Sequence, residues 1–494
     1  MSVQKIIIGF ILFTLVSVSV GSAGAYFVAA SGDNNNPGTK GSPWQTIQFA
    51  VNKVQGGDTI NVRNGIYNEL ITFHQSGDSA KGYIVLKNYQ NEKPVISGDG
   101  LAGKNGDRPA FIEIIDKSYI RVDGFEMRNL ITDKPQIFPI GIWITGAAHH
   151  IDILNNNVHH IQNPTRRGGH GIAVYGTDAG APIHDILIDG NEVSFGLFGS
   201  SESVVINGNV ENWVVRNNIV HDNNNIAFDF IGHERKCSVP ELDQARNGLV
   251  VGNIAYNIDS RGNPAYGNSA CADGFYVDGG RDIIMERNEV YNCNIGIELA
   301  SEHGGKATSN IVLRNNYIHD NPIIGLAMGG YDAKRGITND CQILNNTFYN
   351  NNTEKSDYGS EILLQYYCRD NTFKNNLIYG GDDVTFIKNQ SGTGSENHFD
   401  YNLYFTQGKP IWMWDNNKFE LLDDFQKTTG QEEHALFTNP LFTASGSMPA
   451  IKSSSPAIDK GDSEIEDDCG TEDYFDKIRV VNDLIDIGAA EYQD

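Results

Sequence analysis

Two stretches of the chain repeat one order of polar and apolar positions. DNNNIAFDFIGHE runs from Asp222 to Glu234, and CNIGIELASEH runs from Cys293 to His303. Each stretch places an acid between two large apolar residues. Because side chains alternate across a strand, such an acid points away from the face that carries its apolar neighbours. The pattern predicts strands with an apolar inner face and carboxylates on the outer face.

A short signature recurs through the middle of the chain. Asn follows another polar residue or Gly and precedes a mostly β-prone pair, as in NNNV, GNEV and NNIV. The second residue of the signature falls at positions 156, 191, 218, 253, 288, 316, 346, 376 and 402, which are 26 to 35 residues apart. Such a period is one turn of a solenoid. Asn suits the corners because it tolerates left-handed backbone, and equivalent Asn residues can stack between coils.

The segments between these corners are short and rich in β-branched and aromatic residues, as in IIMERNEVYN and IVLRNNYIHD. They predict an all-β solenoid of parallel strands stacked coil on coil. A β-sandwich or propeller with polar loops is the alternative, but neither fold needs one Asn signature per repeat. Near the N-terminus, Ile47, Val51 and Val54 share one face of a short helix candidate, which we expect to cap the first coil.

The first 25 residues have the pattern of a secretory signal peptide. Lys5 precedes an apolar run from Ile6 to Val20, and Ala23-Gly24-Ala25 supplies the small residues of a cleavage site. We expect a secreted, extracellular or periplasmic protein with no membrane insertion after removal of residues 1–25; an uncleaved anchor is the alternative. The rest divides into a capped β-helix over residues 26–438 and a loop-rich segment over residues 439–494 that packs back on the coils.

Charge and cysteine content narrow the possible partners. The formal net charge of −25 argues against nucleic acid or an anionic membrane surface. The negative charge is compatible with an acidic extracellular surface, with a neutral glycan as partner or with bound divalent cations. We also expect the protein to be a monomer. Six cysteines are too few for a disulfide scaffold. Cys341 and Cys368 occupy similar places in adjacent repeats, so they either pair or remain buried thiols.

Three parts of the chain resemble a known family. They are YFVAASGDNNNPGTKGSPWQTIQFAVNKVQGGDTINVRNGIYNE, the Asn-rich coils and the ending SPAIDKGD…DIGAAEY. Together they are similar to the secreted right-handed parallel β-helix family of pectate-lyase-like proteins, over nearly the whole mature chain. The resemblance implies the right-handed β-helix fold. It leaves the chemistry open, because the family includes lyases, hydrolases, epimerases and proteins of unknown activity. The GHG at Gly169 lacks the other elements of a polygalacturonase motif set.

Stacking the rungs predicts a catalytic site. NIAFDFIGHE, ADGFYVDGGR, NIGIELASEH and IIGLAMGGYD share one register. In this register one outward column contains Asp229, Tyr276, Glu298 and Ala327, and the next contains Ile231, Asp278, Ala300 and Gly329. With coils ~4.8 Å apart and a two-residue step of ~6.6 Å, the acids would lie about 8 to 10 Å apart at the backbone. We predict that Asp229, Asp278 and Glu298 are catalytic; a solvated acidic face is the alternative.

The same rungs end in a polar band beside small residues that leave room for a sugar. The predicted substrate-binding residues are Tyr276, His233, Glu234, Arg281, Glu302, His303, Tyr331 and Asp332. Glu361 and Gln365 would extend this band by one coil. His170, in GHGIAVYG, aligns on an earlier coil and is expected to lie too far from the three acids to join their chemistry.

Paired carboxylates predict hydrolysis of a glycosidic bond in an extracellular polysaccharide, a reaction that requires no cofactor. One alternative is β-elimination on a uronic-acid polymer, in which the acids hold calcium and Arg281 or Lys306 abstracts the proton. A non-catalytic glycan-binding or surface protein is the third possibility. Hydrolysis is favoured because the rungs supply few cations to neutralise a substrate carboxylate.

Overall fold

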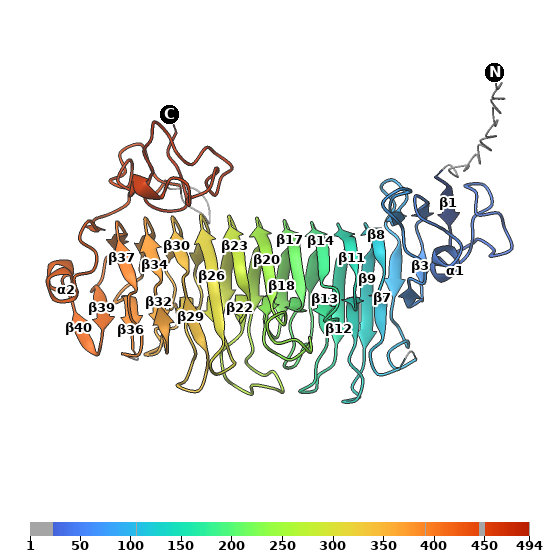
Figure 1. The fold of residues 1–494 in the computed structure, drawn as a ribbon, viewed down its shortest axis with the longest axis horizontal. Coiled ribbons are helices and arrows are strands. Elements are labelled where there is room, and N and C mark those ends of the chain that lie inside the picture. Colours follow the sequence, from blue (N-terminus) through green and yellow to red (C-terminus); the bar gives the residue numbers. More distant parts are fainter. Residues whose placement is uncertain (1–22, 105, 391, 444–449, 494) are drawn as a thin grey trace, which may run out of the picture.

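The computed structural model describes residues 23–493 apart from residues 105, 391 and 444–449, so the predicted signal peptide lies largely outside the described residues. Three long parallel sheets stack coil on coil along one axis (Figure 1). Successive strands of the chain enter the three sheets in turn, which confirms the predicted parallel β-helix. Within the described residues no helix has the length and apolar character needed to cross a bilayer.

Within each sheet, neighbouring strands come from successive coils and run parallel, except at the end of the second sheet, where β39 and β40 form an antiparallel hairpin. The first sheet contains β1 (Ala25–Val28), β2 (Thr59–Val62), β5 (Ile84–Asn88), β8 (Ser118–Asp123), β11 (His149–Leu154), β14 (Ile183–Asp189), β17 (Val210–Arg216), β20 (Ala245–Val251), β23 (Arg281–Glu286), β26 (Ala307–Arg314), β30 (Gln342–Leu344), β34 (Thr372–Lys374) and β37 (His398–Asp400), with β29 (Ile337–Asn339) and β33 (Cys368–Arg369) beside them. The second sheet contains β4 (Ile71–Thr72), β7 (Ala110–Ile115), β10 (Ile140–Thr145), β13 (His170–Gly176), β16 (Val204–Gly208), β19 (Phe228–Ile231), β22 (Asp273–Asp278), β25 (Ile295–Ala300), β28 (Ile324–Met328), β32 (Ser360–Leu364), β36 (Thr385–Asn389), β39 (Ile411–Trp414) and β40 (Asn417–Phe419). The third sheet contains β3 (Ile66–Tyr67), β6 (Val95–Ser97), β9 (Glu126–Ile131), β12 (Asn157–Gln162), β15 (Glu192–Ser194), β18 (Ile219–Asn223), β21 (Ile254–Ile258), β24 (Glu289–Cys293), β27 (Tyr317–His319), β31 (Thr347–Tyr349), β35 (Leu377–Tyr379), β38 (Leu403–Phe405) and β41 (Leu436–Phe437).

The predicted Asn signature forms a hydrogen-bonded ladder at the corner between the first and third sheets. All nine reference Asn residues are buried. From Asn156 to Asn376, each side-chain Nδ2 donates to Oδ1 of the reference Asn in the next coil, at 2.9–3.1 Å. The last rung, Asn402, donates to Glu432 at 2.9 Å. The ladder satisfies buried amides that the bend leaves outside the sheets and fixes the register between coils.

The left-handed backbone at this corner belongs to the residue before each ladder Asn. Asn155 has φ 51° and Gly190 has φ 68°. Arg287 and Tyr401, both at φ 55°, occupy the same position although their side chains disfavour it. Asn therefore contributes to these corners in two separate ways: the preceding position needs its tolerance of positive φ, and the ladder position needs its amide.

The two ends of the coil stack are covered. Helix α1 (Ile47–Val51) begins after Thr46, whose side chain accepts a hydrogen bond from the Phe49 amide, and it buries Ile47 and Val51. Val54 is buried as well, as the predicted cap requires. Helix α2 (Leu422–Thr429) buries Phe425 at the other end, and a short 3-10 helix spans Ser463–Ile465.

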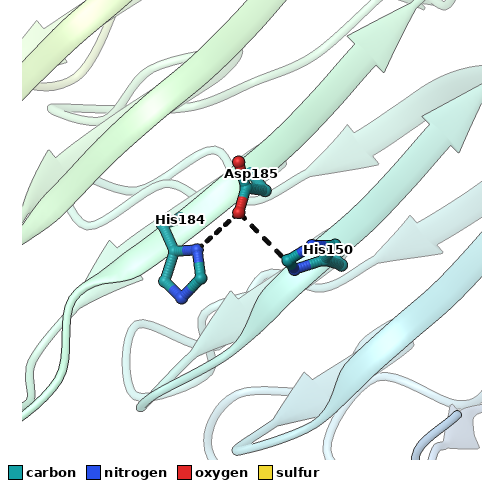
Figure 2. A group of neighbouring side chains, drawn as sticks. All are labelled: His150, His184 and Asp185. Atoms are coloured by element: carbon teal, nitrogen blue, oxygen red, sulfur yellow. Dashed lines mark hydrogen bonds and ion pairs between the residues drawn. The ribbon is translucent and has the colours of Figure 1, made fainter. Parts of the chain in front are cut away.

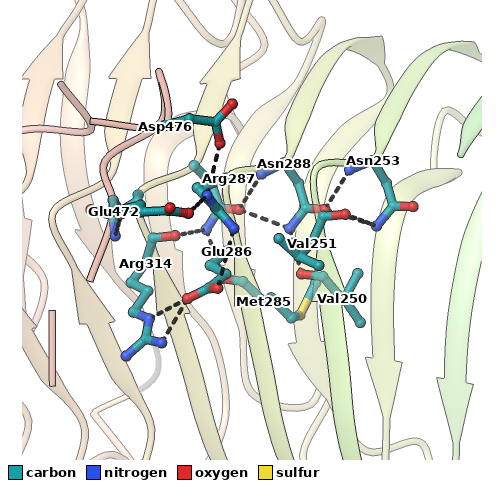
Figure 3. Close-up of polar contacts among 12 residues, drawn as sticks. Val250, Val251, Asn253, Met285, Glu286, Arg287, Asn288, Arg314, Glu472 and Asp476 are labelled. Carbon is teal, nitrogen blue, oxygen red and sulfur yellow. Dashed lines mark hydrogen bonds and ion pairs between the residues drawn. The ribbon is translucent and has the colours of Figure 1, made fainter. Parts of the chain in front are cut away.

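The loop-rich C-terminal segment lies along the later coils (Figure 1). Asn345 donates to the Asp486 carbonyl at 2.9 Å, and Arg314 donates to the Asp468 carbonyl at 2.7 Å. Figure 3 shows Arg287, at its strained corner, bonded to Asp476 at 2.8 Å and to Glu472. Most coils place Asn or Gly before the ladder Asn. Arg287, which takes this position in its coil, instead holds the C-terminal segment in place.

The described cysteines are unpaired. Cys341 and Cys368 are buried, and burial raises the pKa of the Cys341 thiol to about 12. Of the two states left open by the sequence, the structure contains buried thiols.

Asn253 tests the ladder. Replacement by Ala removes the acceptor of the Asn218 amides and the donor to Asn288, so buried polar groups lose their partners. We expect Asn253→Ala to lower the free energy of unfolding by about 2 to 4 kcal/mol. Urea denaturation followed by circular dichroism measures the change. Asn417→Ala, at an exposed Asn outside the ladder, is the matched control; equal losses in both variants would contradict a stabilising ladder.

Candidate functional site

The outer face of the second sheet carries the first predicted column of residues. Asp229 lies opposite Tyr276, Tyr276 opposite Glu298, and Glu298 opposite Ala327. The neighbouring position holds Phe228 opposite Phe275, whose rings stack in the interior with centroids 4.7 Å apart. The predicted register of these rungs is therefore confirmed.

The second predicted column is only partly formed. Asp278 lies opposite Ala300, as expected. Ile231, however, forms an antiparallel bridge with Gly279 instead of lying opposite Asp278. Gly279 has φ 79°, so the chain turns immediately after β22 and the parallel pairing with β19 stops early.

The three predicted catalytic acids are buried, although they are on the outer side of the sheet. Asp229, Asp278 and Glu298 are 2%, 5% and 7% exposed. Tyr266 and Tyr358 come from loops outside the coils; burial raises the pKa of both phenols, followed by the charge of Glu202 for Tyr266 and of Glu298 for Tyr358. Loops therefore shelter this part of the outer face from water.

Some polar atoms in this sheltered region have no hydrogen-bond partner among the described residues. They include Oδ1 of Asp229 and the hydroxyl of Tyr276, which is 4% exposed. By contrast, Oδ1 of Asp278 accepts a hydrogen bond from the Glu302 amide at 2.7 Å. Asp229 and Tyr276 are therefore well placed to gain stability from a proton, an ion or a ligand.

Asp273 joins the acids, and simple alternation missed it. Alternation would turn it inward with Phe275. The strand instead bends at Gly274, where a Cβ would lie 2.3 Å from the Val290 side chain, so the preceding residue points outward. Asp273 lies opposite Ile295, which belongs to the outer apolar cluster with Ala327. The glycine shared by three rungs, at 274, 296 and 325, is the sequence signal for this bend.

Glu202 is a further acid that the sequence analysis did not find. It precedes β16 in a loop, where alternation does not apply. Burial, followed by the charge of Glu234, raises the pKa of Glu202 to about 8. Burial, followed by Glu202, raises the pKa of Asp229 well above its ordinary value. The pKa of Glu298 is raised to about 7, by burial first and Glu302 second.

Residues 233–237, which we call the dividing segment, separate two clefts. Asp243 fixes this segment: its carboxylate accepts hydrogen bonds from the amides of Arg235, Lys236 and Cys237 at 2.6–3.1 Å. Its carbonyl accepts another from the His233 amide at 2.6 Å. Neighbouring residues of the segment consequently face different clefts, and Arg235 lines both.

The upstream cleft has a volume of about 620 Å³ and combines acids, cations and aromatic rings. Glu202 and Glu234 supply the carboxyls. Its cations are Arg108, Arg167, Arg235 and Lys236, and its aromatic side chains include Phe138, Trp143 and Tyr175. Such a lining offers both charge pairing and stacking surface to a sugar chain.

His170 lies in this upstream cleft, beside Glu202. Its Nδ1 is 3.0 Å from the Glu202 carbonyl and 3.5 Å from the Glu202 carboxylate, and Nε2 is 3.1 Å from the Tyr175 hydroxyl. Burial lowers the pKa of His170 to about 4, so the imidazole is neutral at pH 7. The contacts of His170 are with Glu202 and Tyr175, so its expected separation from Asp229, Asp278 and Glu298 stays a prediction.

The predicted substrate-binding residues do not share one site. Glu234 lines the upstream cleft, whereas His233, Glu302 and His303 line the downstream cleft, which has a volume of about 570 Å³ and also contains Lys306. The single polar band is therefore split by the dividing segment. Tyr331 is 45% exposed and packs under Arg335, which in turn contacts Asp332 at 3.7 Å. The nearby Glu302 charge raises the pKa of Tyr331, after burial.

Two other predicted positions are corrected. Arg281 begins β23 in the first sheet and bonds the adjacent Asp282, because the turn at Gly279 carries the chain off the second sheet before Arg281 is reached. Glu361 is fully buried and bonds the Asn351 side chain at 2.6 Å. Ser360 lies opposite Ile324, so the next residue, Glu361, is aligned with Gly325. Its side chain points inward and accepts the hydrogen bond of Asn351. Gln365 is 5% exposed.

The three stacked parallel sheets define a β-helix protein. The acids on the outer face of its second sheet form a candidate binding and catalytic site. The chain belongs to the right-handed β-helix family. The family model described as right handed beta helix region matches residues 140–333 and 261–423, and the Pel9A-like, right handed beta helix region matches residues 26–177. The predicted resemblance to pectate-lyase-like proteins is thereby confirmed.

Individual relatives agree with this assignment. The uncharacterized protein YwoF of Bacillus subtilis strain 168 is 36% identical over 441 residues, covering 89% of this chain and 92% of YwoF. Pectate lyase PEL9 of Emericella nidulans is 31% identical over 125 residues, which are 25% of this chain and 30% of that enzyme. The complex of XylC with xylose shares the fold with a TM-score of 0.52 at 14% identity, over 94% of this chain and 98% of XylC.

Replacement of Asp229 tests whether the pKa of this buried carboxyl is raised in the folded protein. Because its pKa is raised in the folded state, folding binds a proton, and stability falls as pH rises above the ordinary aspartate range. Asp229→Asn removes this term, so its gain in unfolding free energy over wild type should grow with pH, by up to about 1.4 kcal/mol per unit.

Denaturation midpoints at pH 5 and pH 8 measure this difference. Asp423→Asn, at a carboxylate 79% exposed on α2, is the control and should show no such growth. A gain of Asp229→Asn over wild type that is no larger at pH 8 than at pH 5 would contradict a raised pKa of Asp229.

Proposed function

We propose that this chain is an extracellular enzyme that hydrolyses glycosidic bonds of an acidic polysaccharide in the upstream cleft. One observation carries the proposal: a sheltered carboxyl with a raised pKa, Glu202, shares a cleft wall with the more exposed carboxyl of Glu234, and four cations surround them. Inverting hydrolysis needs one carboxyl that gives a proton and one that takes a proton from water.

Glu202 is the proposed general acid. With a pKa of about 8 it carries a proton at neutral pH, which it can transfer to the leaving glycosidic oxygen. The neutral His170 imidazole, with Nδ1 3.0 Å from the Glu202 carbonyl, supports the backbone from which this side chain projects. The Tyr175 hydroxyl in turn fixes the imidazole through Nε2.

Glu234 is the proposed general base. Its side chain is 36% exposed and can reach water in the cleft. Asn207 donates to its Oε2 at 2.8 Å, and Nζ of Lys236 lies 3.4 Å from the same oxygen, so two neighbours hold this carboxyl in the cleft. Different surroundings thus suit the two carboxyls to opposite tasks, as acid–base catalysis requires.

The cleft suits a sugar polymer that carries carboxylates. Guanidinium groups bind carboxylates through paired hydrogen bonds, and the cleft contains Arg108, Arg167 and Arg235. Trp143 and Tyr175, with ring centroids 5.0 Å apart, offer an aromatic surface for a sugar ring. The similarity to pectate lyase PEL9 supports an acidic polysaccharide as the class of substrate.

In this proposal Asp278 acts through Glu202, and none of the acids Asp229, Asp278 and Glu298 contacts the substrate. Their burial leaves little surface for a substrate. The charge of Asp278 contributes to the raised pKa of Glu202, after burial and Glu234, and the charge of Glu202 contributes to the raised pKa of Asp229. Asp278 is the proposed positioning residue that helps to keep the acid protonated.

β-Elimination is the second candidate, and the cations favour it. The sequence of the strands offered few cations to neutralise a substrate carboxylate, which argued against elimination. The upstream cleft contains four cations, so this argument no longer holds. In this mechanism the sheltered carboxylates would bind calcium, whose preferred ligands are oxygens, and Lys236 or Arg235 would take the proton. The position of Arg281 in the first sheet and that of Lys306 in the downstream cleft make both less suitable as the base.

Product analysis with pectin-type polymers distinguishes these two reactions. We expect reducing ends to appear without ultraviolet absorbance from an unsaturated product, and chelator to leave the rate unchanged. Glu202→Gln should lower kcat at least about 100-fold, because a general acid contributes roughly that factor. Glu354→Gln, at a surface glutamate paired with Arg261, is the control. Absorbance that rises with cleavage and disappears with chelator would establish elimination; binding without cleavage would contradict both reactions.

The pH profile gives an independent test. If Glu202 must be protonated, kcat should fall as pH rises through about 8. A lyase that needs a deprotonated base should instead gain activity over the same range. Initial rates between pH 5 and pH 10 measure the profile, and a rate that keeps rising above pH 8 would exclude Glu202 as the acid.

A further inference from the structure

A histidine cluster on the outer face of the first sheet lies apart from both clefts. His150, His184 and Asp185 each present a ligand atom, and these atoms lie within 4.8 Å of one another. Figure 2 shows the two imidazoles on either side of the carboxylate. His184 Nδ1 is 2.7 Å and His150 Nδ1 is 3.5 Å from the same oxygen of Asp185.

The cluster is built by two adjacent coils. His149 of β11 lies opposite His184 of β14, and their rings stack with centroids 4.8 Å apart and an interplanar angle of 2°. His149 Nδ1 is also 2.9 Å from His150 Nδ1. On the other side, Tyr119 of β8 stacks on the His150 ring at 4.4 Å. The imidazoles are therefore held in place by neighbours on three successive strands.

The backbone at His150 makes the choice of residue unusual. Most coils have positive φ at this position of the strand: the preceding coil places Tyr119 there, at φ 54°, and the following coils place Asp185, Asn212, Asn247 and Asp282 there, at φ 52–54°. His150 takes the same position at φ 53°. Asn and Asp are the residues that best tolerate this conformation, so an imidazole at this bend is not explained by the fold alone.

We propose that His150, His184 and Asp185 bind a divalent transition metal of the zinc class, which ties coil β11 to coil β14. Zinc takes imidazole nitrogen and carboxylate oxygen as ligands at about 2.0–2.2 Å, so ligand atoms around one ion lie roughly 3.3–3.5 Å apart. The observed separations, 2.7 and 3.5 Å to the Asp185 oxygen and at most 4.8 Å within the whole group, lie on both sides of that value. The side chains are 31%, 33% and 49% exposed, so the ion can enter from solvent.

A second histidine pair in the chain shows what distinguishes this site. His159 and His160 of β12 repeat the arrangement, with Nδ1 atoms 2.7 Å apart and His160 at φ 55°. There the next coil places Ser194 opposite His159, whereas the preceding coil places Arg128 opposite it. The carboxylate at this pair, Glu126, lies 3.4 Å from His159 Nε2 but is already paired with Arg128 at 2.7 Å, so we expect no metal at this pair. His160→Asn is therefore a matched control for His150→Asn.

Zinc binding to the purified full-length mature protein tests the proposal, with a chromophoric chelator as competitor. We expect one zinc ion per chain, and at least tenfold weaker binding in His150→Asn and in Asp185→Asn. Asn keeps the left-handed backbone at both positions, and circular dichroism checks the fold. His184→Gln, at an ordinary strand position, should weaken binding to the same extent. Zinc should raise the melting temperature of wild type and His160→Asn, but not that of the three cluster variants.

Three outcomes would overturn the proposal. They are a wild-type chain that takes up no zinc at micromolar concentrations, unchanged binding in the cluster variants, and equal loss of binding in His160→Asn. None of these measurements depends on polysaccharide cleavage, so the metal site and the proposed hydrolysis fail or succeed separately.

Discussion

Stacking of equivalent residues from coil to coil is the constraint on which the whole structure depends. A parallel β-helix has no local element that is stable alone, because each coil buries its apolar face only against its neighbours. The Asn ladder fixes the register of this stacking with two hydrogen bonds to each acceptor, one from the side chain and one from the backbone, as between Asn253 and Asn288. Side chains that are dozens of residues apart in the sequence, such as Asp229 and Tyr276, become neighbours only because this register holds along the stack.

The same stacking concentrates charge. A column repeats at the spacing of strands, so acids in adjacent coils are held a few ångströms apart and cannot separate. Loops then exclude water, and burial becomes the first cause of the raised pKa values of Glu202, Asp229 and Glu298. The protein keeps protons on carboxyls that would be ionised in water, and this lowers its stability at high pH. A sheltered acid cluster of this kind is more readily explained by chemistry than by folding.

The sequence predicted the features that arise from periodicity and missed those that depend on turns and loops. The nine ladder positions and the column of Asp229, Tyr276 and Glu298 are regular consequences of a repeat and an alternation. The alternation pattern did not identify Asp273, because the strand bends at Gly274. It did not identify Glu202, because this residue belongs to a loop. The upstream cleft could not be foreseen at all, since Arg108 and Arg235 come from loops of different coils that only the folded chain brings together.

Positions where a residue other than Asn, Asp or Gly has positive φ are the most informative ones in this repeat. The corner before the ladder and the bend of the first sheet both require positive φ, and most coils place Asn, Asp or Gly there. Arg287 departs from the rule and binds the C-terminal segment; Tyr401 departs from it and stacks on His434 with centroids 4.5 Å apart. In both cases the strained residue makes a contact that Asn could not make. His150 is the same kind of exception: besides stacking on Tyr119 it faces two imidazoles and a carboxylate, and this set of possible ligand atoms supports the proposed metal ion.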